Sequence, residues 1–312
     1  MSSGFLALMA FAPILLAGIL LIGLRWPARR AMPLVYLLSA GIALFVWDMS
    51  FNRVLASTLQ GLVVTVGVLW IIFGAILLLN TLKHSGGITA IRAGFTTISP
   101  DRRIQAIIIA WLFGCFIEGA SGFGTPAAIA APLLVAIGFP AMAAVLMGML
   151  VQSTPVSFGA VGTPIIVGVN TGLDHAAIGE QLAVAGSSWE AYLQLITSQV
   201  AIVHALVGTV MPLVMVIMLV RFFGQDKSWR AVFEVLPFAL FAGVSMTIPY
   251  VLGGVFLGPE FPSLIGGLVG LAVVTTAARA GFLVPKRQWD FAPRESWPAA
   301  WMGTVEMKLE EL

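Results

Sequence analysis

The sequence predicts an all-helical membrane protein that crosses the bilayer several times, with about seven spanning helices. Of its 312 residues, 59% are hydrophobic and only 10% are charged, whereas a soluble domain carries about 25% charged residues. Its mean hydropathy is +1.01. Apolar runs of about 20 residues recur along the chain, and this is the length that a helix needs to cross a hydrocarbon core of about 30 Å.

The composition also excludes several classes of function. A formal net charge of +2 is too small to indicate binding of nucleic acid. Cys115 is the single cysteine and lies in an apolar run, so it supports neither a disulfide nor a zinc site. The phosphate-binding motif GxxxxGK[ST] does not occur, which argues against direct coupling to ATP. We therefore expect neither a metal nor a cofactor.

Six uninterrupted apolar runs are expected to cross the membrane as single helices. They are Phe5–Leu24, Met32–Trp47, Thr58–Leu82, Leu195–Val220, Val232–Leu257 and Ser263–Ala280. The first is interpreted as a helix and not as a removable signal, because no A-x-A-like cleavage site follows it. The segment Gly86–Pro100 is more polar and is expected to lie at the membrane interface.

The distribution of basic residues predicts the orientation, because cytoplasmic loops collect Lys and Arg. Basic residues concentrate in four segments, at 25–31, 83–103, 221–231 and the tail beyond 282. These segments are predicted to be cytoplasmic, and the segments 48–57, 171–194 and 258–262 are predicted to lie outside. The N-terminus is then outside and the C-terminal tail is inside.

The stretch 104–170 must cross an odd number of times, because residue 103 is predicted inside and residue 171 outside. Its apolar pieces are short: the piece 104–117 covers roughly 21 Å as a helix, less than the core of about 30 Å. We therefore predict a re-entrant hairpin over 104–138 and a single discontinuous helix over 141–170. Three ordinary short helices would also satisfy the parity and would place Glu118 near the outer surface.

This organisation divides the chain into four parts. They are a scaffold of three helices with an interfacial segment at 1–103, the hairpin and broken helix at 104–170, an outer loop with three further helices at 171–282, and a cytoplasmic tail at 283–312.

Two breaks rich in Gly, Ser, Thr and Pro interrupt the apolar sequence, GASGFGTP at 119–126 and TPVSFGAVGTP at 154–164. Irregular backbone at membrane depth is tolerated only where protein or a water-filled cavity satisfies its polar groups, and broken helices of this kind point to the binding site of a transporter. In Thr125-Pro126 and Thr163-Pro164 the threonine resembles an N-cap, with proline at the first helical position. Two half-helix N-termini would then face one anion.

The candidate substrate-binding residues are the small and hydroxyl-bearing residues of these breaks. They are Gly119, Ala120, Ser121, Gly122, Gly124, Thr125, Thr154, Ser157, Gly159, Gly162 and Thr163. The glycines would allow close approach of the backbone, and the hydroxyl groups would donate to a small carboxylate. The alternative is that the glycines are close-packing points and the hydroxyl groups bond back to their own helices.

Glu118 is the only acidic residue between Asp101 and Asp174. An acidic residue embedded in a membrane indicates function by default, and apolar surroundings favour the uncharged form of a carboxyl group. Glu118 is therefore either the carrier of a coupled proton or a brace that accepts hydrogen bonds from the loop amides. His204, within an apolar helix, is a weaker candidate for proton coupling and could equally be a packed histidine with one partner.

The runs FIEGASGFGTPAAIAAPLL and TPVSFGAVGTPI resemble the L-lactate permease family of bacterial inner-membrane carboxylate transporters. The resemblance implies proton-coupled uptake of L-lactate and related 2-hydroxy monocarboxylates such as D-lactate and glycolate. It also implies one half of an inverted-repeat, ion-transporter-like fold. Family members are nearly twice as long, so the resemblance covers their N-terminal half to two-thirds. It leads us to expect that a second half or a partner chain completes the site.

Two other classes of function compete with a transporter. The sequence Gly119-Ala120-Ser121-Gly122 matches the GxSG motif of rhomboid intramembrane proteases, in which Ser121 and His204 would form a Ser–His dyad. A motif of four residues is weak, and this alternative leaves the second break and Glu118 without a role. A passive carboxylate channel is the other alternative, and it would not concentrate its substrate.

Overall fold

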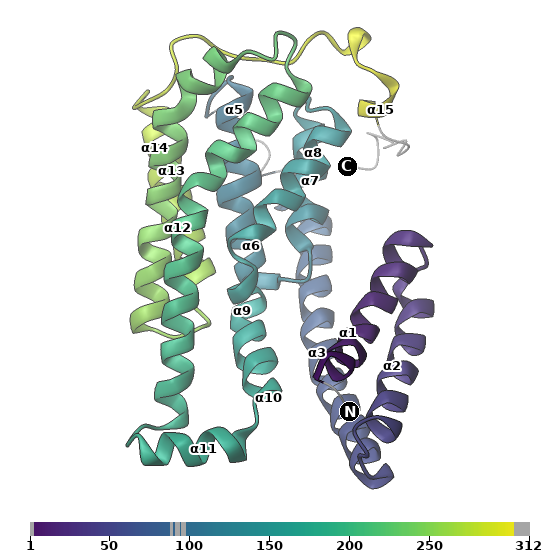
Figure 1. Ribbon diagram of the computed structural model, residues 1–312. Helices are drawn as coiled ribbons and strands as arrows, with labels where there is room; N and C mark the ends of the chain where they lie inside the picture. Colours follow the sequence, from purple (N-terminus) through teal and green to yellow (C-terminus); the bar gives the residue numbers. More distant parts are fainter. Residues whose placement is uncertain (1–2, 88–89, 91–93, 95–97, 303–312) are drawn as a thin grey trace. The chain divides into compact units, whose positions relative to one another are not determined.

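The computed structural model describes residues 3–87, 90, 94 and 98–302, and its chain forms two compact units, Met1–Trp70 and Ile71–Leu312 (Figure 1). All the regular structure in the described part is helical. Most of the predicted interfacial segment Gly86–Pro100 lies outside the described residues. The division of the chain into four parts with separate roles stays a prediction, because the two units are defined only by how compactly their residues pack.

Unit 1 holds α1 (Ser3–Gly18), which continues as a π-helical turn to Gly23, then α2 (Ala28–Phe45) and the start of α3 (Phe51–His84). The predicted helices are present, but α2 begins before Met32 and α3 before Thr58. The prediction was too short because a helix continues past its apolar run, where charged residues such as Arg29 and Arg53 reach out of the hydrocarbon.

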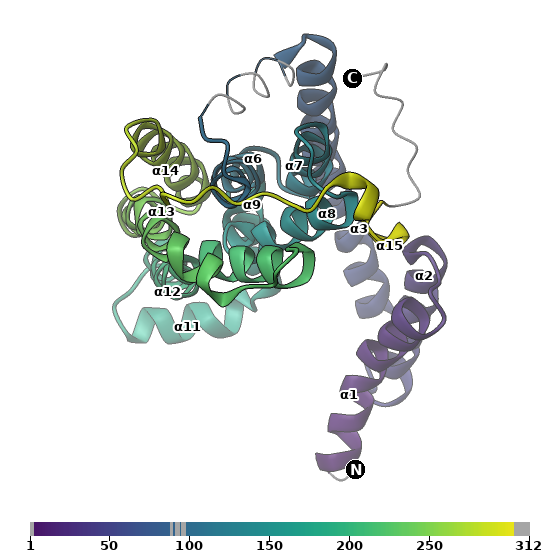
Figure 2. The same ribbon diagram turned by 90° about the horizontal axis from the view of Figure 1, so that it is seen from above.

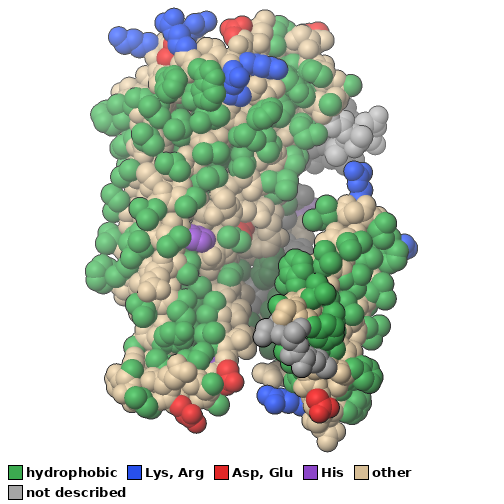
Figure 3. All heavy atoms as spheres, viewed as in Figure 1, with side chains coloured by type: hydrophobic (Ala, Val, Ile, Leu, Met, Phe, Trp, Pro, Cys, Tyr) green, Lys and Arg blue, Asp and Glu red, His purple; other side chains and the backbone are tan. Residues whose placement is uncertain are grey.

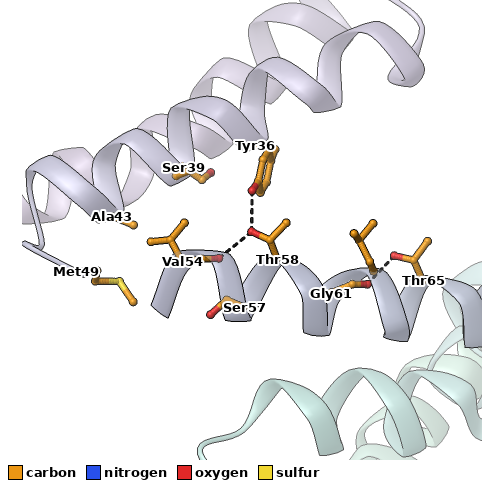
Figure 4. Close-up of a pocket in the computed structure, with 11 residues that line it drawn as sticks. Tyr36, Ser39, Ala43, Met49, Val54, Ser57, Thr58, Gly61 and Thr65 are labelled. Carbon is orange, nitrogen blue, oxygen red and sulfur yellow. Dashed lines mark hydrogen bonds between the residues drawn. The ribbon is translucent and has the colours of Figure 1, made fainter. Parts of the chain in front are cut away.

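A cavity of about 580 Å³ lies between α2 and α3 within unit 1 (Figure 4). Tyr36 and Thr58 share a hydrogen bond of 2.7 Å between their hydroxyl groups at this cavity, and the Thr58 hydroxyl also donates to the carbonyl of Val54. None of the residues that line it is among the predicted site residues. The cavity therefore belongs to the pairing of α2 and α3.

Unit 2 begins its core with a helical hairpin. Three helical segments follow one another without a gap and descend from the hairpin's base: α5 (Arg102–Gln105), a π-helical segment (Ala106–Phe113) and α6 (Gly114–Ser121). The returning arm is α7 (Thr125–Ala136). The guanidinium Nη1 of Arg102 donates to the carbonyl of Ile137 at 2.5 Å, so the two ends of the hairpin lie side by side. The predicted hairpin over 104–138 is therefore formed, with both of its ends at one level of unit 2.

The descending arm corrects one detail of the prediction. The apolar piece 104–117 was expected to be too short to span, but the helix Arg102–Ser121 has 20 residues and is long and apolar enough by composition. It turns back at Gly122, partway along the bundle in Figure 1, as a re-entrant hairpin would. Seven described helices meet the criteria of length and hydropathy for a span, and a bent pair supplies an eighth.

That bent pair is the predicted discontinuous helix. It enters as α8 (Ala141–Leu150) and leaves through α10 (Asn170–Gly172), and its two halves meet at 67°. Figure 1 shows the hairpin turning back partway along the bundle while the broken helix continues past it to α11 (His175–Val184). The predicted outer loop 171–194 therefore contains a helix, which begins where the Asp174 carboxylate caps the amides of Ala176 and Ala177.

Three long helices form the frame on which the hairpin and the broken helix pack: α12 (Trp189–Phe223), α13 (Trp229–Phe256) and α14 (Pro262–Arg279). Small residues let these backbones approach closely, as in many membrane bundles. For example, a Cβ atom on Gly267 of α14 would lie 2.6 Å from the backbone nitrogen of Phe116 in α6. This contact brings the frame against the helix that ends at the first break.

The tail runs across one end of unit 2, over the base of the hairpin and the start of α8, to the short helix α15 (Ala299–Met302) (Figure 2). The amide of Arg102 donates to the carbonyl of Trp289, and the amide of Trp289 donates to the carboxylate of Asp101. Arg103 is fully buried and pairs with Asp101 at 2.6 Å. On the face shown in Figure 3, Lys and Arg side chains of unit 2 gather at this same end.

Candidate functional site

The first break is a tight turn that its own backbone and hydroxyl groups hold. Gly122, Phe123 and Gly124 have φ values of 59°, 52° and 77°, so the chain passes through the left-handed region that favours glycine. The amide and the hydroxyl group of Thr125 both donate to the carbonyl of Gly122, at 3.0 and 2.6 Å. The Ser121 hydroxyl donates to the carbonyl of Ile117 one turn earlier.

One expectation about this turn was wrong by one residue. Thr125 is not the N-cap of the returning helix: Gly124 is, and Thr125 is the first helical residue with Pro126 next. The left-handed conformation of Gly124 reverses the chain before the threonine. The Thr125 side chain consequently points its hydroxyl group back at the turn.

The second break is longer and more strained. Two short 3-10 turns, Val151–Ser153 and Val156–Phe158, lead to three consecutive residues in the left-handed region: Ala160, Val161 and Gly162. Left-handed backbone costs a residue with a Cβ atom roughly 1–2 kcal/mol, and a β-branched residue such as Val161 adopts it rarely. Such strain persists only where surrounding structure enforces it, and it concentrates at functional sites.

The two breaks lie against each other. A Cβ atom on Gly122 would approach the backbone nitrogen of Ala160 to 2.8 Å, and a Cβ atom on Gly159 would approach Oε1 of Glu118 to 2.8 Å. Gly122 is therefore required by the close approach, whereas the atom nearest Gly159 is the end of a flexible side chain, which can shift. The carboxyl group beside the first break thus lies on the backbone of the second.

Glu118 is buried, with 2% of its surface exposed, and its Oε2 atom has no hydrogen-bond partner among the described residues. No loop amide donates to its carboxyl group in the described part of the chain. An unpaired buried carboxylate is very costly, whereas an uncharged carboxyl group is tolerated. The contacts expected of a brace are therefore not present around this side chain.

Three side chains from three helices of the frame hold the carbonyl groups that the second break frees. Nδ1 of His204 and the hydroxyl group of Tyr250 both contact the carbonyl oxygen of Thr154, at 2.8 and 3.0 Å. The Ser263 hydroxyl donates to the carbonyl of Pro155 at 2.8 Å. We call His204, Tyr250 and Ser263 the carbonyl bracket. It satisfies backbone oxygens that have no partner within a regular helix.

The bracket also defines the role of His204. A carbonyl oxygen only accepts, so Nδ1 carries the hydrogen and Nε2 is left as the acceptor. The Ser157 hydroxyl lies 3.3 Å from Nε2. Both ring nitrogens therefore have partners in the second break, and the hydroxyl group of Ser121 has its own partner elsewhere. The Ser121–His204 dyad of the protease alternative is not formed.

The remaining predicted residues divide between packing and possible ligand contact. Gly119 packs on the backbone of Ser263 and Leu264, Gly162 packs on the carbonyl of Pro259, and Thr163 donates to the carbonyl of Ala160. Ala120 and Gly124 are half-buried at the turn. The Thr154 hydroxyl is buried and has no partner among the described residues.

Two members of the carbonyl bracket, Tyr250 and Ser263, were not identified from the sequence. The sequence shows each of them only as a polar side chain inside an apolar helix. Many other polar side chains have this pattern and bond only to their own helix. No group of three or more His, Cys, Asp or Glu side chains that could hold a metal ion occurs within the described ranges.

These features define a class: a multi-pass helical membrane protein in which a re-entrant hairpin and a broken helix meet at a buried carboxyl group. Comparison with known proteins then gives the family. The model of the L-lactate permease family matches residues 6–306, and the chain belongs to that family.

Named relatives agree. The L-lactate permease of Salmonella typhimurium is 33% identical over 271 residues, which cover 86% of this chain and 45% of the relative. The L-lactate permease of Bacillus subtilis is 32% identical over 263 residues, 83% of this chain and 42% of the relative. The glycolate permease GlcA of Escherichia coli is 31% identical over 270 residues, which cover 86% of this chain and 44% of the relative. These relatives are permeases and not enzymes.

The chain spans less than half the length of these curated relatives. No solved structure matches it.

Proposed function

We propose that this chain carries the site of a secondary active transporter, which takes up L-lactate and related short 2-hydroxy monocarboxylates together with a proton. The names of its relatives, which include lactate permeases and a glycolate permease, support the substrate class. The observation that carries the coupling is Glu118: a buried carboxyl group whose Oε2 atom has no hydrogen-bond partner among the described residues, at the contact between two helix breaks.

The two charges involved explain why proton and substrate would move together. A substrate carboxylate at the breaks would lie near the carboxyl group of Glu118, and two carboxylates in one site repel each other. A proton on Glu118 removes this repulsion, so substrate and proton favour each other's binding. The Thr154 hydroxyl at the second break, which has no partner among the described residues, is the donor that the substrate would meet, whereas the Ser157 hydroxyl donates to Nε2 of His204.

The backbone supplies the rest of the attraction for an anion. Helix α7 begins directly after the first break, and a second helical segment, Pro164–Val169, begins directly after the left-handed residues. The N-terminus of each segment carries the positive end of the helix dipole. Buried cations do not perform this task here: the fully buried Arg103 lies at the hairpin's base, paired with Asp101.

The membrane and the orientation are part of the same proposal. The basic residues at the tail end of unit 2 support the proposal that this end is cytoplasmic and that α11 is outside, in a bacterial inner membrane. A cysteine at Gly179, which is half-buried on α11, should react with an impermeant reagent from outside, and one at the exposed Arg294 should not. The reverse pattern would invert the orientation.

The proposal also includes a partner chain or a second half that completes the site. Its support is that three apolar side chains at the breaks, Phe123, Val156 and Val161, are 42–47% exposed. Uptake by this chain alone and with a co-expressed second half of a relative would test it. Equal uptake in both cases would remove the need for a partner.

The central experiment compares the chain with its Glu118→Gln variant, which imitates the permanently protonated side chain. In proteoliposomes, exchange of labelled lactate for lactate should persist in the variant, whereas accumulation driven by a pH gradient should be lost. Glu180→Gln, which changes an exposed carboxylate on α11, is the matched control and should retain both activities. A parallel Na⁺ gradient distinguishes the coupling ion.

Binding gives a readout that does not need turnover. Calorimetry of lactate binding in buffers of different ionisation enthalpy should show proton uptake by the unmodified chain and none by Glu118→Gln. Accumulation that is intact in Glu118→Gln would rule out Glu118 as the proton carrier. Absence of accumulation in the unmodified protein, together with rapid passive flux, would favour a channel.

A further inference from the structure

A second site lies at the other end of the hairpin, away from the two breaks. It is a cavity of about 410 Å³ between the hairpin's exit and the tail. Arg102, Asp290 and Arg294 supply its charges, and the rings of Phe139, Phe291 and Trp297 form much of its wall. None of these residues takes part in the proposed transport chemistry.

The cavity offers guanidinium donors that protein groups do not use up. Arg102 bonds through Nε to Asp290 at 2.9 Å and through Nη1 to Gln105 and the carbonyl of Ile137. Its Nη2 atom has no hydrogen bond among the described residues and lies over Gly138, where even a Cβ atom would come within 3.1 Å. The absence of a side chain at Gly138 keeps Nη2 accessible from the cavity.

Arg294 adds a charge that nothing in the described chain neutralises. It is exposed at the start of a short 3-10 turn, and its guanidinium makes no ion pair or hydrogen bond with a described residue. With Arg102 and Asp290 opposing each other, the cavity holds one net positive charge. A singly charged phosphate diester is the complementary ligand, and arginine binds phosphate oxygens in a bidentate geometry.

An apolar strip leads from this cavity along α8. That helix begins at Ala141, which lines the cavity, and it presents Met142, Val145 and Met149 on one face at 48%, 46% and 62% exposure. Their spacing of three and four residues places them in a line along the helix. A ligand with a charged head in the cavity would thus have an apolar surface on which to lay a chain.

The level of the cavity agrees with such a ligand. It lies at the end of unit 2 where Lys and Arg side chains gather, the level at which lipid headgroups meet a membrane protein (Figure 3). Aromatic rings are also favoured at this level, and basic pockets between helices on this side of a membrane bind anionic headgroups.

We propose that the cavity between the hairpin exit and the tail binds the phosphate headgroup of an anionic phospholipid, with an acyl chain along the exposed face of α8. A bound lipid would join the hairpin to the tail through one ligand. The proposal is independent of the transported substrate and stands or falls separately from the transport function.

The test uses the full chain in detergent and native mass spectrometry, with dioleoyl-phosphatidylglycerol and dioleoyl-phosphatidylcholine as probes. The chain should retain phosphatidylglycerol preferentially. Arg294→Gln should weaken its binding about fivefold, which corresponds to about 1 kcal/mol for one basic residue near the headgroup. Arg294 has no partner among the described residues, so this variant should fold normally.

Arg279→Gln is the matched control, because Arg279 is also exposed at this end of unit 2 but does not line the cavity. It should leave lipid binding unchanged. Equal retention of the two lipids, or an equal loss in both variants, would overturn the proposal. Competition by glycerol phosphate as effective as that by the whole lipid would also overturn it, in favour of a site for soluble anions.

Discussion

The two helix breaks of this protein look alike in sequence, but different parts of the molecule hold them. The first turns within three residues, and its hydroxyl groups bond to carbonyls at most four residues away. The second spans two 3-10 turns and three left-handed residues, and its carbonyls bond to side chains 50, 96 and 108 residues away. The first break is a local structure, and the second is enforced by the frame α12–α14.

This difference suggests that the two breaks respond differently to movements of the frame. A break that depends on the frame transmits any movement of the frame to the backbone beside Glu118, whereas a local turn moves as one piece with its hairpin. Substitutions in the second break should therefore have large effects on stability, whereas the loss of a locally bonded hydroxyl group in the first should have a small one.

The largest effect is expected for Gly162→Ala. A Cβ atom there would lie 2.5 Å from the carbonyl oxygen of Pro259, and the φ value of 78° disfavours alanine. Overpacking and left-handed strain together should lower the free energy of unfolding by about 3 kcal/mol, measured by thermal unfolding in detergent. Gly168→Ala is the control in the same broken helix, where a Cβ atom would meet nothing within 4 Å, and it should be neutral or slightly stabilising.

The effects of removing Tyr250 and His204 from the carbonyl bracket on stability should not be additive. Tyr250→Phe and His204→Leu each leave the Thr154 carbonyl with one donor, and each should cost about 1 kcal/mol. The double variant leaves that buried carbonyl without either donor, so its cost should exceed the sum by about 1 kcal/mol. Strict additivity in this double-mutant cycle would show that the two side chains do not act on one group.

A substitution that removes a side chain from the second break, in place of adding one, should test whether its left-handed residues are strained. Val161 is left-handed and 44% exposed, so Val161→Gly relieves backbone strain and loses little packing. We expect a gain of about 1 kcal/mol in stability. The same change at Val167, in a regular helical segment, should instead destabilise the protein, because glycine is a poor helix former. A loss of stability at both positions would argue that the left-handed residues are not strained.

The smallest effect is expected in the first break, for Ser121→Ala. The Ser121 hydroxyl bonds to a carbonyl of its own helix, so its loss should change stability by less than about 0.5 kcal/mol. Lactate exchange should be retained. Abolition of all activity by this one change, with the fold intact, would revive the protease alternative.

Much of this architecture was predictable because its signals are local. The lengths of the apolar runs give the number of helices, and the Gly/Pro clusters mark both breaks. The parity of the basic loops requires an odd number of crossings between residues 103 and 171, and the short apolar pieces favour a hairpin there, whose two ends the Arg102–Ile137 contact joins. Helix ends were less predictable, as α2 and α3 show, since a helix continues beyond the apolar stretch that reveals it.

The sequence by itself determined the class of the protein, the position of its two breaks and the one acidic residue beside them. Hydropathy and backbone preference act over a few residues, so they can be seen without a fold. Only the tertiary structure decided that Glu118 lies against Gly159, and that His204 holds a carbonyl. Those contacts join residues about 40 and 50 positions apart, and the packing of whole helices, which no local pattern encodes, brings them together.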